Sequence, residues 1–239
     1  MASEYLKWKY REEKPAEKRV LTPGEKRKNW WHYHKWHAAA GAVLVCIGVS
    51  LACNALGVGQ TRPDYQIAYV GENALPGGTA AAIENAFASL GEDLNGDGQV
   101  SVRLNQYPMT PSDPGVAAAN QTTLMADLLD CESYFFLLED PEWFQANYRS
   151  LRRLDGSLPE EDDRSAEGTY LSWSACPALA EIELGSYSEQ VLGETVTGSG
   201  DELVSGLCLA RRGFRTEKTA PYPEGCGALW NRLTEGAVS

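Results

Sequence analysis

The chain has 239 residues and a net charge of −12 at pH 7, and this total combines two parts of opposite charge. Residues 1–37 carry ten Lys or Arg against five Glu, whereas residues 59–239 carry 11 Lys or Arg against 28 Asp or Glu, about −17 in net charge. A C-terminal part this acidic excludes nucleic acid as a partner, because proteins bind the phosphate backbone through Lys and Arg.

The basic segment, residues 1–37, is poor in apolar residues over most of its length, and we expect it to be largely disordered. Its last part, NWWHYHKWH at residues 29–37, is rich in aromatic rings, which settle at the headgroup depth of a membrane. A basic segment beside a membrane is also attracted to anionic lipid. These features indicate a cytoplasmic tail next to a bilayer.

Residues 38–59 contain no charged residue, and about 20 apolar residues are enough to cross the hydrocarbon core of a bilayer. Because the basic residues lie on its N-terminal side, we predict an uncleaved single-pass transmembrane helix in the cell membrane, with a cytoplasmic N-terminus. Three alternatives fit less well. A cleaved signal has an apolar region of about 7 to 15 residues. A lipoprotein signal ending before Cys53 usually has Leu where this chain has Ser50. A buried soluble helix leaves the aromatic flank unexplained.

Four cysteines follow this segment: Cys131, Cys176, Cys208 and Cys226. An even number of cysteines outside the cytoplasm allows two disulfides. However, Cys131 and Cys208 adjoin apolar runs that would bury them as free thiols, and the sequence leaves both states open. A zinc site is excluded, because these residues include no Cys-x-x-Cys pair and no His follows the membrane segment.

Residues 60–239 are predicted to form one extracytoplasmic domain, which begins with a strand, a helix and a strand. The run YQIAYVG at residues 65–71 is rich in strand-forming residues. Thr79 is expected to cap the following helix, which Gly91 ends. Residues 99–107 then alternate apolar and polar side chains, as a half-exposed strand does.

The next elements are a helix, a strand and a helix. Residues 116–130 are predicted to be helical, with an apolar stripe formed by Leu124, Met125, Leu128 and Leu129. The run at residues 133–138, SYFFLL, is continuously apolar, as in a strand covered on both faces. Asp140 and Pro141 then begin a helix that points Trp143 and Phe144 inward.

This order over residues 65–150 predicts an α/β ectodomain with a largely parallel sheet flanked by helices. The acidic segment at residues 154–168 is expected to be mobile. The remaining elements are predicted as strands at 169–173 and 203–214, a Gly- and Thr-rich loop at 192–200, and a closing helix at 225–236.

The passage DLNGDGQVS has the spacing of a calcium loop, in which oxygens at positions 1, 3, 5, 7 and 9 bind the ion and a Gly at position 6 makes the turn. The five ligand positions are Asp93, Asn95, Asp97, Gln99 (through its carbonyl) and Ser101. The passage resembles the start of EF-hand and dockerin loops, which implies a structural calcium ion. Position 12, a Glu in EF-hands, is Leu104, and Glu92 or an acid among residues 160–163 is the expected substitute. The alternative is an ordinary helix-to-strand turn.

Several kinds of catalysis are excluded, because the outer domain has no His and its one Lys is Lys218. Its 28 acids still allow a pair for glycoside hydrolysis. An anchored acid-based hydrolase of envelope polysaccharide is therefore the alternative function, although we favour a protein without enzymatic activity. The run RRGFR at Arg211–Arg215 would bind either a polymer carboxylate or the acidic surface of the domain itself, and we favour the surface.

The passage TTLMADLLDCESYFFLLEDPEWF and the element order over residues 65–150 resemble one lobe of extracellular solute-binding proteins. In those proteins a helix leads into a strand whose carboxyl end lies near the ligand cleft. The overall pattern also resembles uncharacterised single-pass membrane-anchored bacterial proteins. These resemblances imply an anchored binding or scaffolding domain. Its expected partners are membrane lipid, through the anchor, and an unidentified ligand or protein of the cell envelope.

Overall fold

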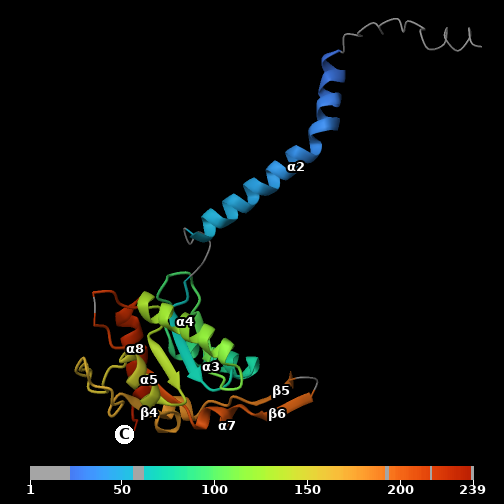
Figure 1. The fold of residues 1–239 in the computed structure, drawn as a ribbon. Helices are drawn as coiled ribbons and strands as arrows, with labels where there is room; N and C mark the ends of the chain where they lie inside the picture. The colour runs from blue at the N-terminus through green and yellow to red at the C-terminus, as the bar shows by residue number, and fades with distance from the viewer. Residues whose placement is uncertain (1–21, 56–61, 192–193, 216, 238–239) are drawn as a thin grey trace, which may run out of the picture. The chain divides into compact units, whose positions relative to one another are not determined.

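The structure is a computed structural model that describes residues 22–55, 62–191, 194–215 and 217–237. The chain divides into two units, Met1–Gln60 and Thr61–Ser239, and each has its own structure (Figure 1).

The described part of the first unit is mainly one helix, α2 (Pro23–Ala55). Thr22 and Glu25 form a capping box at its start, in which the Thr22 N–H donates to the Glu25 carboxylate at 2.9 Å. This cap starts the helix well before the uncharged segment. Its Pro23–Leu51 part is long and apolar enough to span a membrane, a property that signal sequences share. At 1.5 Å per residue, α2 is about 50 Å long and exceeds the roughly 30 Å hydrocarbon core.

The second unit is built on a mixed five-stranded sheet in the order β2-β1-β3-β7-β4. Its strands are β1 (Tyr65–Gly71), β2 (Val102–Pro108), β3 (Phe135–Leu138), β4 (Tyr170–Ser172) and β7 (Cys208–Arg211). The pairs β1–β2 and β1–β3 are parallel, whereas β7 is antiparallel to both β3 and β4. The α/β prediction is confirmed, but the parallel pairing holds only for the first three strands. β7 departs from it because a hairpin and short helices, rather than one long crossover helix, connect it to β4.

Helices cover both faces of this sheet. They are α3 (Gly77–Leu90), α4 (Pro114–Asp130), α5 (Pro141–Tyr148) and α8 (Pro223–Thr234). Successive strand residues point to opposite faces, so Phe135 and Leu137 of β3 lie in one hydrophobic cluster with side chains of α3 and α8. Phe136 and Leu138 lie in a second cluster with side chains of α4 and α5. All four are fully buried, as the continuous apolar run predicts.

The helix starts follow the sequence in one case and not in another. Asp140 caps α5 as predicted, since its carboxylate accepts the Trp143 N–H at 2.8 Å. The predicted cap of α3 was wrong, because this helix begins at Gly77 after Pro76, and Thr79 is a buried residue within its first turn.

The apolar stripe predicted for α4 is only half buried. Leu124 and Leu128 pack into the core, but Met125 and Leu129 are 46% and 72% exposed. Asp127 shares the buried face instead, where its carboxylate accepts hydrogen bonds from the hydroxyl groups of Tyr107 in β2 and of Ser133 just before β3.

Between β4 and β7 the chain forms small elements. These are the 3-10 turn η1 (Trp173–Ala175), α6 (Pro177–Ala180), the paired strands β5 (Ser186–Val191) and β6 (Glu194–Ser199), and α7 (Gly200–Ser205). Part of the expected Gly- and Thr-rich loop is therefore β6, because its Thr and Val residues favour a strand. The strand predicted at residues 203–214 is divided between the end of α7 and β7.

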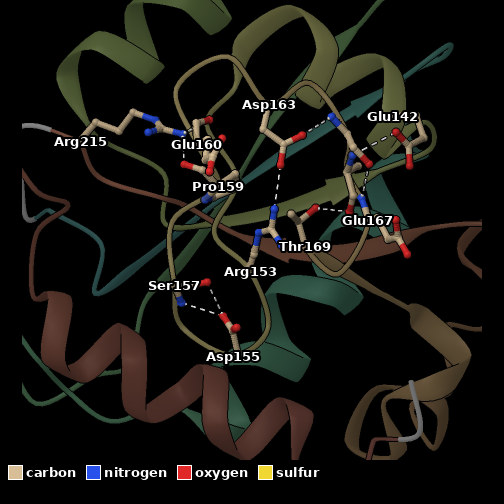
Figure 2. A network of polar contacts seen from close by, with 12 residues as sticks. Glu142, Arg153, Asp155, Ser157, Pro159, Glu160, Asp163, Glu167, Thr169 and Arg215 are labelled. Carbon is tan, nitrogen blue, oxygen red and sulfur yellow. Dashed lines mark hydrogen bonds and ion pairs between the residues drawn. The ribbon is translucent and has the colours of Figure 1, made fainter.

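The acidic segment, residues 154–168, was expected to be mobile, but hydrogen bonds and an ion pair connect it to the rest of the second unit (Figure 2). Arg153 forms an ion pair with Asp163 at 2.7 Å. Arg215 donates to two backbone carbonyl oxygens of the segment, at 2.7 and 3.1 Å. Near the C-terminal end of the segment, the Ala166 N–H donates to the carboxylate of Glu142 in α5 at 3.0 Å.

Candidate functional site

The residues predicted to bind calcium lie on the connection between α3 and β2: Asp93, Asn95, Asp97, Gln99 and Ser101. The Asp93 carboxylate accepts the backbone N–H groups of Gly96 and Gly98, each at 2.7 Å. Asn95 and Asp97 each accept the N–H two residues further on, at 2.8 and 2.9 Å. Both glycines have positive φ, of 77° and 88°, which other residues rarely adopt. Hydrogen bonds between the side chains and the backbone of the loop itself therefore stabilise the turn.

Asp64, which the sequence did not single out, ties this loop to the sheet. It is 2% exposed, and its Oδ1 accepts the N–H groups of Leu94 and Asn95 at 2.8 and 2.9 Å. Its Oδ2 accepts the N–H of Ser101 at 2.7 Å. Burial alone would raise the pKa of Asp64, but the hydrogen bonds from Ser101, Asn95 and Leu94 outweigh burial and lower it.

Among the residues that it describes, the structure places no acidic side chain where position 12 of a calcium loop would supply a ligand. Leu104, at position 12, is buried in β2, and its N–H donates to Glu84 at 2.7 Å. Of the proposed substitutes, Glu92 is paired with Arg232 of α8, and Asp163 is held in the acidic segment. In residues 22–55, 62–191, 194–215 and 217–237, no three His, Cys, Asp or Glu side chains form a metal-binding group. Calcium would depend on two loop carboxylates and on amide, hydroxyl and carbonyl oxygens.

A cavity of about 400 Å³ lies where β1, β2 and β3 end. These strands run parallel, so their carboxyl ends meet at one edge, which is the edge where open α/β sheets bind ligands. Glu72 follows β1 directly, and Glu139 and Asp140 follow β3. These three acids were not among the predicted site residues, although their places directly after predicted parallel strands were a usable signal.

Glu139 joins two of these strand ends. Its Oε1 accepts the Tyr69 hydroxyl at 2.6 Å, and its Oε2 accepts the Glu72 N–H at 2.7 Å. Burial and the bond to Glu139 raise the pKa of Tyr69, so the phenol stays a donor. A Cβ on Gly71 would overlap the Tyr69 hydroxyl and would lie 2.5 Å from Glu139 Oε1. A side chain at position 71 would therefore displace the Tyr69–Glu139 pair.

The remaining wall of the cavity is apolar, with Met109 and Pro111 following β2 and Trp143 on α5. The predicted inward orientation of Trp143 was wrong: it is 38% exposed, whereas Phe144 takes the buried position. The Trp143 ring meets the Tyr148 ring edge-on, with centroids 5.7 Å apart. The residues lining this cavity include no Lys, Arg or His, and its acidic residues share the lining with an indole ring and a thioether.

The negative charge of this edge acts beyond the cavity. Burial raises the pKa of Cys208, at the start of β7, and the charge of Asp140 adds to the effect. Burial also raises the pKa of Tyr170 in β4, with further contributions from Cys208, Glu142 and Asp140. A thiol with a raised pKa is protonated at neutral pH and is a poor nucleophile.

The four cysteines of the second unit are free thiols in this structure. Cys131, Cys176 and Cys226 are buried, and Cys208 is half-buried. Burial raises the pKa of Cys176 to about 11 and that of Cys226 to about 12. They pack as small apolar side chains.

The basic run Arg211–Arg215 serves the fold. Arg211 donates to backbone carbonyl oxygens at 3.0 and 3.1 Å and lies over the Trp230 ring, 5.0 Å from its centroid. Arg212 is buried, donates to the Leu128 carbonyl and lies over a Phe ring. Arg215 holds the acidic segment through carbonyl oxygens. The run therefore binds the domain itself, as favoured, but mainly through backbone oxygens instead of surface carboxylates.

A second cavity, of about 540 Å³, lies beside β4 and the acidic segment. Its lining includes Glu142, Glu167 and Tyr170. Glu142 already holds the acidic segment, so this space belongs to the packing of that segment. The cavity at the ends of β1, β2 and β3, named the carboxyl-edge cavity below, is the better candidate site.

The chain matches no protein-family model, no curated protein and no solved structure.

Proposed function

We propose that the chain is a single-pass membrane protein whose second unit lies outside the cytoplasm and binds a small solute in the carboxyl-edge cavity. The cavity itself is the observation that carries this proposal. Its volume of about 400 Å³ falls within the range of small-molecule sites, roughly 300 to 1,000 Å³. Its position at a parallel-strand edge is the usual one for ligands of α/β sheets.

The distribution of basic residues supports this orientation of the chain in the membrane. The basic residues precede the uncharged part of α2, and such residues stay on the cytoplasmic side. The Trp and Tyr residues of 29–37 are exposed on α2, as an interfacial belt requires. A protease added to intact cells should then digest the second unit and spare the N-terminal tail. A cleaved signal would instead release the second unit in soluble form.

Binding is favoured over hydrolysis by the state of the reactive groups. The second unit has no His, and its one lysine, Lys218, forms an ion pair with Asp130 at 2.8 Å. Both carboxylate oxygens of Glu139 accept hydrogen bonds from the protein. The nearby thiol, Cys208, has a raised pKa. The carboxyl-edge cavity thus supplies recognition groups and no activated nucleophile.

The calcium loop belongs to the proposal as a structural element. Asp93 and Asp97 retain unshared lone pairs beyond the N–H groups that they accept. Extracellular calcium modules bind with dissociation constants of about 10⁻⁴ to 10⁻³ M, so an incomplete loop suffices in that setting. The ion would fix the turn from α3 to β2.

The solute proposal is tested on the full chain in detergent micelles, by thermal unfolding with a panel of cationic, neutral and anionic small solutes. Pro111→Trp introduces a large ring at a position that lines the carboxyl-edge cavity, in order to fill it, and Ser112→Trp adds the same ring at the next position, which does not line it. At least one solute should raise the Tm of the wild type and of Ser112→Trp, but not that of Pro111→Trp. If no solute produces a Tm increase that Pro111→Trp abolishes, the cavity is not a binding site.

A further inference from the structure

We infer that the carboxyl-edge cavity takes an organic cation, a small ammonium compound with an apolar part. This inference rests on the proposed function and adds the chemical class of the solute. The cavity combines carboxylates at two strand ends with an aromatic and thioether wall.

The charge of the lining selects a cation. Glu72, Glu139 and Asp140 line the cavity, and the lining contains no basic residue to neutralise them. Glu139 and Asp140 also accept N–H or O–H donors, which keeps their carboxylates in place. Glu72 contributes its backbone N–H and carbonyl to the fold, while its side chain stays exposed and available to a ligand. An anionic solute would meet like charge at each of these positions.

The size and the spread of the acids favour an organic ion over a metal ion. Within the described residues, these three carboxylates are not among any group placed to share one metal ion. A volume of about 400 Å³ is roughly that of a dozen water molecules at about 30 Å³ each. Such a space suits a body of several carbon atoms whose charged end lies against the acids.

The aromatic wall supports the same class. Trp143 lines the cavity with its indole partly exposed, and Tyr148 contacts it edge-on. A cation over an indole ring is attracted by the ring quadrupole, most strongly when both are shielded from water. Met109 adds a polarisable surface to the lining of the same cavity. Carboxylates and an indole together are the groups that bind ammonium compounds.

The test uses isosteric pairs that differ in charge. Choline is compared with 3,3-dimethyl-1-butanol, and benzylamine with benzyl alcohol and benzoate. Binding to the full chain in micelles is followed by calorimetry at low and at high salt. We expect saturable binding of at least one of the two amines, weaker at high salt, and no binding of its neutral or anionic counterparts.

Three variants connect this binding to named residues. Trp143→Leu should weaken amine binding roughly 2- to 30-fold. Glu72→Gln should weaken it roughly 2- to 5-fold, since the side chain is exposed. Glu132→Gln, a matched exposed acid just before β3, should leave it unchanged. Unfolding curves equal to those of the wild type show that each variant is folded.

The outcomes separate the inference from the proposed function. If neither amine binds, or if amine binding is insensitive to both Trp143→Leu and Glu72→Gln, the inference is wrong. If a neutral or anionic solute then binds in a manner that Pro111→Trp abolishes, the cavity is still a binding site, for another class. If nothing in either panel responds to Pro111→Trp, both proposals fall.

Discussion

Asp64 and Ser101 lie 37 residues apart and are joined by hydrogen bonds in both directions. The Ser101 N–H and hydroxyl donate to Asp64 Oδ2 at 2.7 and 3.1 Å, and the Asp64 N–H donates to the Ser101 carbonyl at 2.9 Å. The same carboxylate holds two further backbone N–H groups of the loop. One buried side chain therefore connects the start of β1 to the whole turn before β2.

Replacing this carboxylate should destabilise the second unit. In Asp64→Asn the new amide turns a donor toward the N–H of Ser101, so we expect a loss of about 2 to 3 kcal/mol in the free energy of unfolding. Asp97→Asn, which keeps its one acceptor oxygen at an exposed position, should change this free energy by less than about 0.5 kcal/mol. Urea unfolding measures both, and equal effects would show that Asp64 does not organise the loop.

The same residue gives a pH dependence of defined sign. Since the folded pKa of Asp64 lies below its ordinary value, its contribution to stability is present above about pH 4 and is lost as the pH falls through the folded pKa. The difference in unfolding free energy between wild type and Asp64→Asn should therefore shrink below about pH 4. Other acids titrate in both proteins and cancel in the difference. A difference that stays constant down to pH 2 contradicts a lowered pKa.

Local patterns predicted the elements from β1 to α5 well, because each depends on residues close in sequence. The continuous run of β3 gave a fully buried strand, and Asp140 gave a helix cap. Asp64 had no such pattern, since its partners begin 30 residues later. Its role arises from the pairing of β1 with β2, which sets Tyr65 beside Val102.

The candidate site was predictable in part. The resemblance to solute-binding proteins pointed to the carboxyl end of β3, where Glu139 and Asp140 lie. It did not supply Glu72, although this residue directly follows the predicted strand β1, and it did not supply Met109, which lies beyond the end of β2 in a loop. The direction of β7 was equally hidden, because an antiparallel strand buried on both faces has the same apolar sequence as a parallel one.

Calcium should stabilise the chain modestly through the loop at 93–101. With a dissociation constant of about 1 mM, 10 mM calcium would add about 1.4 kcal/mol to the free energy of unfolding. Asp97→Asn should reduce this gain. Asp155→Asn is the matched control, because Asp155 makes the same contact to an N–H two residues on, but in the acidic segment. Thermal unfolding with and without calcium measures this gain. If calcium does not stabilise the wild type, or if it stabilises Asp97→Asn equally, the loop does not bind calcium.

The acidic segment should open when its ties are cut. Arg215→Ala removes two hydrogen bonds to backbone carbonyl oxygens, and we expect cleavage within residues 154–168 to become roughly tenfold faster. Arg164→Ala, an exposed change within the segment, is the control and should leave the rate unchanged. Limited proteolysis with mass spectrometry locates the cuts. Equal rates in both variants would mean that Arg215 does not hold the segment.

The four cysteines of the second unit should remain reduced in an oxidising environment, since burial protects three of them and raises the pKa values of Cys176 and Cys226. Protein purified without reductant and then denatured should be alkylated at Cys131, Cys176, Cys208 and Cys226, as read by peptide mass spectrometry. Of these four, only the half-buried Cys208 should react in the folded state, and slowly, because burial and the charge of Asp140 raise its pKa. An amine that fills the adjacent carboxyl-edge cavity should weaken the effect of Asp140 and speed this reaction. Peptides joined by a disulfide would contradict the free-thiol state directly.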